Sequence, residues 1–353
     1  MRRKSITNRI ALMLVTIVVL FAMTGCGGGN PSGNTEPGKI LSQTEDEITI
    51  VDQAGREVTV PKKIESIALS YRVAIRFLLN LDQGDKIKGI GKSEPFLEEL
   101  QPSLADCVNV GQGVADIEAV AELDPDVFFH KASDTETLDA LDKIGVPAVG
   151  IEIETPEDMM TALDLMGKVC GAEEKAQTLI NYYNEQLAEI EELTSEISEK
   201  DKKTAIVMGT SIGKVADGSM LQGEMLKRAG AINCADGMQA TELWPTAGAE
   251  QIFEWNPDYI FITGSESAVY DAEDILQDKT WSEITAVKSG DVYVMPAEKD
   301  SWEFPGLVSI LGIDYMIHTM YPELLSDEEL EDKVNELYEL SYGRTFERDE
   351  LGY

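Results

Sequence analysis

Aromatic and cationic side chains gather where apolar segments of the chain end, and side chains of these types can hold a ligand. In the first half of the chain they are Tyr71, Arg72, Arg76, His130 and Lys131. In the second half they are Trp244, Trp302 and Phe304. Flat apolar walls combined with a few positive charges suit a bulky, partly anionic ligand. We therefore predict that these residues contact a bound small molecule.

Several of these positions also have an ordinary structural interpretation. Arg76 could simply pair with a neighbouring carboxylate. His130 could be a hydrogen-bonded core histidine at the end of a buried strand. Tyr71 and Arg72 could be solvated turn residues.

The elements that position these residues alternate between strands and helices. Four apolar segments have the composition of buried strands, at residues 64–70, 126–130, 204–209 and 258–264. Their alternation with helical patterns predicts an α/β protein with mostly parallel sheets. Ligands of such sheets bind outside the carboxyl ends of the strands, which is where most of the candidate residues lie.

One phrase occurs in both halves of the chain. A glutamate, six further residues and a Pro-Asp pair lead into an apolar strand, at residues 118–126 and again at 250–258. Between the halves, residues 173–199 carry apolar side chains three and four positions apart, which predicts one amphipathic helix. We infer two Rossmann-like lobes with a ligand cleft between them. The single stiff helix that joins them should allow closure by only a few degrees.

The start of the chain has the pattern of an export signal. Basic residues precede an apolar run at 10–23, which at 14 residues is shorter than the about 20 that span a membrane. The following residues, Met23-Thr24-Gly25-Cys26, resemble the lipobox of bacterial lipoproteins, in which lipid is attached to the cysteine. Cys26 is therefore the predicted lipidation site. An uncleaved anchor with an incidental cysteine is the alternative.

These patterns divide the chain into five predicted parts. They are a signal peptide at 1–25, a flexible tether at 26–45, an N-terminal lobe at 46–172, a linker helix at 173–200 and a C-terminal lobe with a helical tail at 201–353. The tether is assigned from its Gly, Ser, Pro and Asn residues, which are typical of flexible linkers.

Composition excludes several classes of function. The chain carries 65 acidic and 29 basic side chains, so a nucleic-acid backbone or an anionic membrane surface would be repelled. Its two histidines exclude a His-rich metal cage, and we expect no resident metal or cofactor. No P-loop or strand-linked GxGxxG pattern occurs, so we do not expect an enzyme. The three cysteines after Cys26 are expected to be free thiols.

Six segments, taken in their order and spacing, resemble class III substrate-binding proteins of ABC importers, the family of ferric-siderophore, haem and cobalamin receptors. The segments lie at residues 52–61, 64–70, 110–129, 224–233, 248–263 and 281–296. They cover most of the chain after the predicted tether. The resemblance implies a monomeric, extracytoplasmic, lipid-anchored receptor. It would carry a small-molecule metal chelate to a membrane permease and its ATPase.

In that family one exposed glutamate on each lobe forms salt bridges with arginines of the permease. The resemblance assigns this role to Glu118 and Glu250, the glutamates of the repeated phrase. The helix dipole also favours carboxylates in the first turn of a helix, which would explain both residues without docking.

The resemblance leaves the ligand open among three kinds. Haem receptors of the family often place an iron-binding tyrosine before a proline in the loop after the second strand. Here the loop at 92–96 has Glu94 before Pro95, so the tyrosine is absent and haem is disfavoured, although Tyr71 might substitute for it.

The remaining residues rank the other two ligands. A cluster formed by Arg72, Arg76 and Lys131 suits a ferric siderophore. Aromatic walls formed by Trp244 and Trp302 suit a corrinoid. We rank a ferric siderophore first, a corrinoid second and haem third. A surface receptor that has no role in transport is the alternative outside the family.

Overall fold

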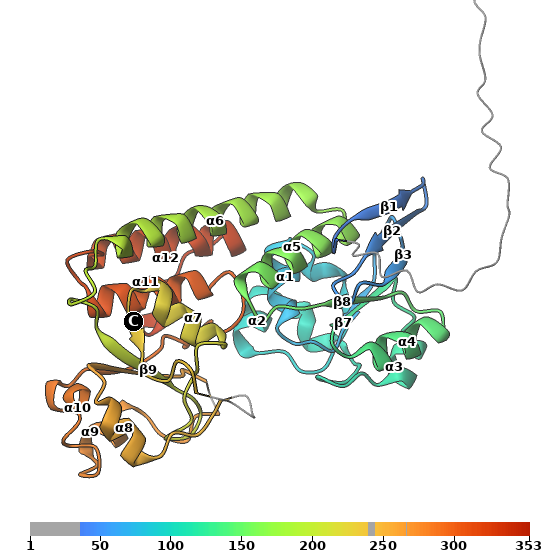
Figure 1. Ribbon diagram of the computed structural model, residues 1–353. Helices are drawn as coiled ribbons and strands as arrows, with labels where there is room; N and C mark the ends of the chain where they lie inside the picture. Colours follow the sequence, from blue (N-terminus) through green and yellow to red (C-terminus); the bar gives the residue numbers. More distant parts are fainter. Residues whose placement is uncertain (1–35, 239–243, 266) are drawn as a thin grey trace, which may run out of the picture. The chain divides into compact units, whose positions relative to one another are not determined.

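Two parallel β-sheets, one from each half of the chain, form the framework of the protein (Figure 1). The computed structural model describes residues 36–238, 244–265 and 267–353, which all belong to one folded unit. Cys26 and the predicted signal peptide lie outside these residues. The prediction of an α/β fold with two lobes is confirmed.

The sheet of the N-terminal lobe has five strands. They are β4 (Ile67–Leu69), β5 (Ile87–Ile90), β6 (Val108–Asn109), β7 (Val127–Lys131) and β8 (Ala148–Ile151). All pair in parallel, in the order β6-β5-β4-β7-β8. Every residue of β4 and β8 is buried, which explains why these segments are continuously apolar rather than alternating.

The sheet of the C-terminal lobe has four strands. They are β9 (Thr204–Met208), β10 (Ile232–Asn233), β11 (Tyr259–Ile262) and β12 (Val292–Val294). They are also parallel, in the order β10-β9-β11-β12. Each predicted apolar segment therefore forms a strand at or near the middle of a sheet.

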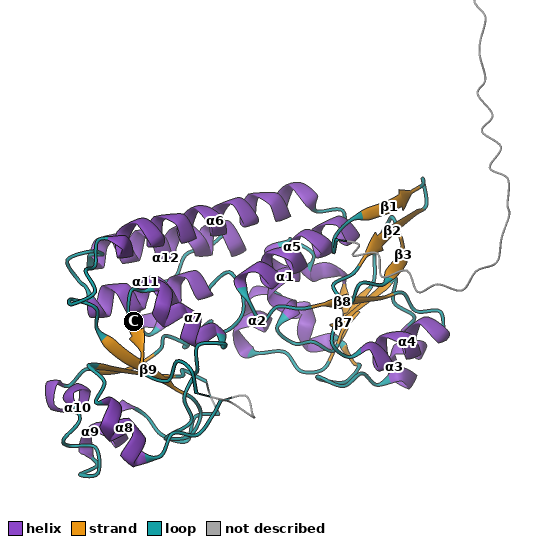
Figure 2. Cartoon of the chain, in the orientation of Figure 1, coloured by secondary structure: helices purple, strands orange, loops and turns teal. Residues whose placement is uncertain are grey.

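Short helices connect the strands of both lobes (Figure 2). The N-terminal lobe has α1 (Ala74–Asn80), α2 (Pro95–Leu100), α3 (Ile117–Leu123), α4 (Thr135–Lys143) and α5 (Pro156–Cys170), with 3-10 turns η1 (Gly84–Lys86) and η2 (Pro102–Asp106). The C-terminal lobe has α7 (Leu221–Arg228), α8 (Ala249–Trp255), α9 (Ala272–Gln277), α10 (Thr285–Ser289) and α11 (Ser309–Met320). No helix among the described residues is both long enough and apolar enough to span a membrane.

The predicted long helix is α6 (Glu173–Ser195), which has 23 residues and runs along both lobes (Figure 1). It ends four residues earlier than the apolar spacing suggests. Thr194 and Ser195 are weak helix formers, and a turn follows them. Its buried side chains, which include Leu179, Tyr183 and Ile190, pack against α5 and α11.

The predicted tether is wrong over its last residues. A small antiparallel sheet, β1 (Ile40–Gln43), β2 (Glu47–Val51) and β3 (Glu57–Pro61), begins inside it. All four side chains of β1 are exposed, including Ile40 and Leu41, so the strand is held by backbone pairing with β2 and not by apolar burial.

The repeated phrase forms the same junction in both lobes. After α3 and after α8, a single residue adopts a left-handed conformation, Asp124 with φ 48° and Asn256 with φ 46°. The aspartate that follows then holds the start of the neighbouring central strand. Asp126 accepts two backbone N–H bonds there, and Asp258 accepts from the backbone N–H and the hydroxyl of Thr204.

The end of the chain crosses back onto the N-terminal lobe. Helix α12 (Asp327–Tyr342) packs against α11 and also against α1, and α13 (Arg348–Leu351) follows it. Phe96 of α2 contacts the rings of Tyr338, Tyr342 and Phe346, with centroid distances of 5.6 to 6.5 Å. We call these four residues the tail seam. The predicted helical tail is therefore shared between the two lobes.

The three cysteines in the described part of the chain, Cys107, Cys170 and Cys234, are free, as expected. Burial raises the pKa of each thiol, to about 12 for Cys170 and about 11 for Cys234. All three therefore stay protonated and unreactive at neutral pH.

Candidate ligand-binding pocket

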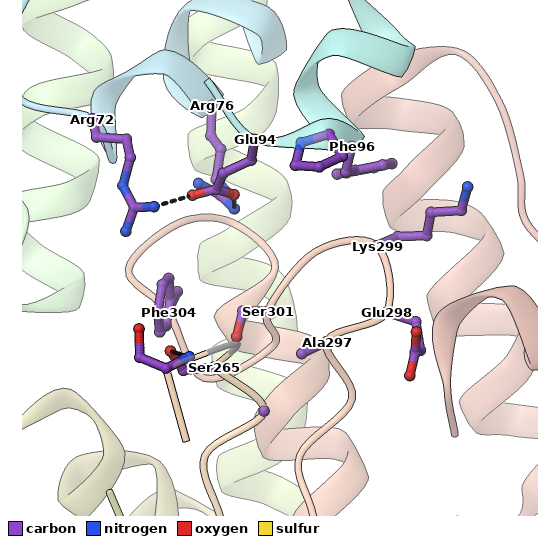
Figure 3. A pocket seen from close by; sticks show the side chains of 13 residues that line it. Arg72, Arg76, Glu94, Phe96, Ser265, Ala297, Glu298, Lys299, Ser301 and Phe304 are labelled. Carbon is purple, nitrogen blue, oxygen red and sulfur yellow. Dashed lines mark hydrogen bonds and ion pairs between the residues drawn. The ribbon is translucent and has the colours of Figure 1, made fainter. Parts of the chain in front are cut away.

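A pocket of about 160 Å³ lies between the two lobes (Figure 3). The N-terminal lobe contributes Arg72, Arg76, Glu94, Pro95 and Phe96. The C-terminal lobe contributes residues that include Gly264, Ser265, Glu298, Lys299, Ser301 and Phe304. Both lobes thus provide charged or polar groups and one aromatic ring each.

Sheet topology explains why these residues meet. In each sheet the chain switches sides between two neighbouring strands, β4 and β7 in one lobe and β9 and β11 in the other. Such a switch leaves a crevice outside the carboxyl ends of the strands. Arg72 follows β4 and Ser265 follows β11, while the loops after β5 and β12 supply Glu94 and Phe304.

Arg76 is a buried cation at the floor of the pocket. It lies in the first turn of α1 and is 3% exposed. Its Nε donates to Asp300 at 2.6 Å, and its Nη2 donates to Glu94 at 2.5 Å. The Tyr342 hydroxyl donates to the other oxygen of Asp300 at 3.2 Å. Burial alone would lower the pKa of Arg76, but Asp300 and Glu94 raise it above its usual range.

Arg72 is the accessible cation of the pocket. Its side chain is 37% exposed, and its Nη1 lies 2.9 Å from Oε1 of Glu94. Glu94 therefore bridges the two arginines, with one oxygen on each (Figure 3). The described residues give Arg72 no second partner, so its other N–H groups can bind a ligand.

Within the described residues, no group of three or more His, Cys, Asp or Glu side chains is arranged to hold a metal ion. The pocket instead offers guanidinium, ammonium, hydroxyl and carboxylate groups beside two aromatic rings. Such groups recognise the outer surface of a small molecule through ion pairs, hydrogen bonds and apolar contact.

Comparison with known proteins decides the family. A sequence profile of periplasmic binding proteins matches residues 67–299. This chain belongs to that family. It is a class III periplasmic binding protein, the substrate-binding protein of an ABC transporter and not an enzyme. A permease is therefore its partner.

Characterised and uncharacterised relatives cover nearly the whole chain. A substrate-binding lipoprotein of an ABC transporter from Bacillus subtilis, YvrC, is 27% identical over 91% of this chain and 99% of its own length. The molybdate-binding protein MolA of Haemophilus influenzae is 25% identical over 85% of this chain and 92% of its own length. The chain is thus homologous to extracytoplasmic binding lipoproteins.

Solved structures show the same architecture. A periplasmic solute-binding protein from Veillonella parvula has a TM-score of 0.76 and 26% identity, over 86% of this chain and 94% of its own. Molybdate-bound MolA has a TM-score of 0.74 over 85% of this chain and 99% of its own, at 21% identity. The two-lobed fold is therefore that of known binding proteins.

Three of the predicted ligand contacts of this binding protein line the pocket, namely Arg72, Arg76 and Phe304. Arg76 also agrees with the alternative interpretation, in which it pairs with a neighbouring carboxylate, because it pairs with two. These three residues come from different loops and helices, and the structure brings them together.

His130 is placed in the core instead. It is fully buried, its Nδ1 lies 2.6 Å from the Ser70 hydroxyl, and its Nε2 lies 2.8 Å from Asp134. Both ring nitrogens are therefore used within the lobe. The prediction of ligand contact at His130 is wrong, and the core interpretation applies.

The two tryptophans also lie away from this pocket. Trp302 is fully buried and donates from its Nε1 to the Tyr338 hydroxyl at 3.1 Å, so it cannot form a wall for a ligand. Trp244 is half-buried, and its ring covers Gly209 at the end of β9. An added Cβ on Gly209 would lie 2.7 Å from that ring, so the contact requires glycine.

Tyr71 and Lys131 form a separate group on the N-terminal lobe. The Lys131 ammonium lies 5.8 Å from the centre of the Tyr71 ring and 2.8 Å from Glu154. Burial and the neighbouring carboxylates raise the pKa of the Tyr71 phenol. These two residues share the edge of the sheet with Arg72 but do not line its pocket.

Glu94, Ser265 and Lys299 line the pocket but were not predicted to contact a ligand. A signal for Glu94 was present in the sequence. Arg76 stands in the apolar helix AIRFLLN, and a buried arginine requires carboxylate partners. The loop at 92–96 offers one, but the sequence does not show that it reaches Arg76.

The glutamates of the repeated phrase occupy equivalent positions. Glu118 and Glu250 are each the second residue of a seven-residue helix, α3 and α8. Both side chains are exposed, and the described residues provide neither with an ion-pair partner. They are therefore available to an external cation on each lobe.

Proposed function

We propose that this binding protein captures a ferric chelate, a ferric siderophore first of all, and delivers it to its permease. The observation that carries the proposal is the pocket between the lobes, where Arg72 offers unpaired N–H groups beside the ring of Phe304. A chelate with oxygen donors on its surface could use the guanidinium while its ligand backbone contacts the ring.

Relatives with named ligands support this choice. An iron-uptake system-binding protein of Bacillus subtilis is 28% identical over 81% of this chain. The petrobactin-binding protein and the iron(3+)-hydroxamate-binding protein of the same organism are 22% and 21% identical. The other ligands of the family are less well supported, because Trp302 is buried and the tyrosine expected for haem is absent.

A compact oxyanion such as molybdate is the second candidate. The pocket volume of about 160 Å³ suits a small ion, whereas a chelate would fill it with one edge only. The similarity to the molybdate-binding protein MolA favours the same candidate.

Calorimetric titration of the chain without its first 25 residues tests the proposal. The probes are a ferric trihydroxamate, a ferric triscatecholate, ferric citrate, molybdate, haem and cobalamin. We expect saturable binding of an iron chelate. Arg72→Ala should weaken it by about tenfold to a hundredfold, because a charge-assisted hydrogen bond to the ligand is lost.

Lys131→Ala is the matched control, because it removes an equally exposed cation at the same sheet edge but outside the pocket. It should leave the affinity unchanged. Binding that is insensitive to Arg72→Ala would place the ligand elsewhere. Binding of none of the probes would favour a surface receptor with no role in transport.

The proposal extends to the attachment and docking of the protein. Lipid on Cys26 would hold a monomeric receptor at the outer face of the membrane, where a high local concentration favours encounter with the permease. Glu118 and Glu250 would then pair with cations on two permease subunits, whose ATPase drives uptake.

A further inference from the structure

Glu94 occupies the place in the pocket that an anionic group of a ligand would use. Its two oxygens lie 2.9 Å from Arg72 and 2.5 Å from Arg76. Its side chain is 22% exposed, so the carboxylate is largely shielded by the cations that it bridges. A ligand anion that approaches Arg72 therefore meets a group that is already bound there.

The charges of the pocket cancel. Arg72 and Arg76 are balanced by Glu94 and Asp300, and the last of these is fixed on Arg76 at 2.6 Å. Lys299 and Arg344 share Glu99, at 2.6 and 2.8 Å. Glu298 adds an exposed carboxylate at the rim. The lining therefore has no excess of positive charge to offer a strongly negative ligand.

We infer that Glu94 selects ligands by their net charge, so that this pocket prefers a neutral ferric chelate to a multiply charged one. The inference rests on the proposed function and narrows the class of ferric chelate that the protein would bind. Three hydroxamates, each with one negative charge, neutralise Fe³⁺, whereas three catecholates leave a net charge of −3. The chelate class that fits is thus the trihydroxamate. Compact dianions such as molybdate are disfavoured for the same reason.

Coulomb's law gives the size of the effect. Two unit charges about 6 Å apart at an effective dielectric constant of about 20 change an affinity by about a hundredfold. Partial exposure of Glu94 to solvent and screening by salt reduce this effect. We therefore expect the affinity to change by about tenfold for each ligand charge that faces Glu94.

The test compares the affinities of three probes, a neutral ferric trihydroxamate, a ferric triscatecholate and molybdate, by calorimetry. In the wild-type protein the trihydroxamate should bind most tightly. Glu94→Gln removes the charge and keeps one acceptor oxygen, so it can accept from only one of the two arginines, while Arg76 keeps its partner Asp300. It should improve binding of the two anionic probes by about tenfold or more, while binding of the trihydroxamate changes by less than about threefold.

Two further variants separate charge from geometry. Glu298→Gln removes the same charge from an exposed rim position and should change each affinity by less than about threefold. Glu94→Asp keeps the charge but shortens the side chain, so the order of the three probes should stay as in the wild type. Circular dichroism and thermal unfolding confirm that each variant is folded.

Failure of the inference and failure of the proposed function give different results. If the probes bind but Glu94→Gln leaves their ratios unchanged, or acts no more strongly than Glu298→Gln, the inference is overturned and the proposed function stands. If folded wild type and Glu94→Gln bind none of the probes, the proposed function fails and the inference falls with it.

Discussion

Asp314, in α11, is a fully buried carboxyl group whose two oxygens have no hydrogen-bond partner among the described residues. Burial raises its pKa to about 7, although nearby Lys333 lowers it and Glu189 raises it further. Lys333 itself donates to Gln186 and Glu189 of α6, and the buried hydroxyl of Tyr182 is also unpartnered. The charged form of Asp314 is therefore the destabilising one.

The sign of the resulting pH dependence follows from linkage. Between pH 4 and pH 7 the folded protein holds a proton on Asp314 that the unfolded chain has released. This group's contribution to the free energy of unfolding is thus fully favourable below about pH 4 and is lost as the pH rises towards 7. Asp314→Asn should stabilise the protein by up to about 4 kcal/mol at pH 8, and by much less at pH 4.5.

Urea unfolding of both proteins at the two pH values measures this difference. Asp332→Asn, an exposed aspartate on α12, is the control for the general effect of removing one negative charge from a strongly acidic protein. An equal increase in the free energy of unfolding from both substitutions would show that the charged form of Asp314 does not destabilise the folded protein.

Single residues also show where prediction from the sequence succeeds and where it fails. Arg72 was predicted because it directly follows a strand, and the position of a residue after a strand fixes its place at the sheet edge. His130 lies inside β7 near its carboxyl end, and its ring nitrogens pair with Ser70 and Asp134 within the lobe. Glu94 was not predicted, since its role depends on Arg76 and on Asp300, which lies 224 residues after Arg76.

At the scale of elements, the tail seam ties the end of the chain to α2. Phe346 is 7% exposed, and its ring centre lies 5.2 Å from that of Tyr338 and 5.6 Å from that of Phe96. The cations of Arg344 and Lys299 lie over the same ring. Apolar burial and aromatic contact therefore hold the tail on both lobes at once.

Phe346→Ala should lower the free energy of unfolding by about 3 kcal/mol, because it leaves a cavity among aromatic rings. Amide protection in α2 should fall with it, and hydrogen exchange measures this. Phe253→Ala, at an exposed phenylalanine on α8, serves as the control and should cost about 1 kcal/mol or less. Unchanged amide protection in α2 would contradict the role of the tail seam in holding the end of the chain on that helix.

The helices and strands themselves were predicted more reliably than the elements against which they pack. The apolar spacing of α6 and the apolar runs of β4 and β11 are local properties, and all three form as expected. The tail helix was predicted too. That it packs on α1 could not be predicted, because no local pattern distinguishes a helix shared by two lobes from a helix of one.

At the scale of the molecule, the repeated junction places one exposed glutamate at the same helical position in each lobe. The double substitution Glu118→Arg with Glu250→Arg should abolish uptake in cells, because both charges that we propose to dock on the permease would be reversed. Ligand affinity should stay unchanged, since neither residue lines the pocket. Uptake of labelled ligand and calorimetry measure the two properties separately.

Glu122→Arg with Glu254→Arg is the matched control. These glutamates lie one turn further along the same two helices and are also exposed. Uptake should be reduced far less by this pair. An equal loss from both double variants would indicate a diffuse charge effect instead of two docking contacts.

Closure of the lobes should be small. Arg76 joins Asp300 across the pocket, Lys299 joins Glu99, and α12 contacts elements of both lobes. The radius of gyration from small-angle scattering should therefore stay within error when the chain without its first 25 residues is saturated with a ligand that it binds. A clear decrease would show that these contacts break and that the lobes close as a hinge.

The path of the tail also bears on how the protein is made. Among the described residues, the aromatic partners of Phe96, which lies in the first third of the chain, all fall within residues 338–346. Contacts so far apart in sequence form slowly, since a long loop must close before they stabilise anything. The lobe that leaves the ribosome first is thus finished last. The contacts of Phe96 can therefore form only after the last residues of the chain have been synthesised.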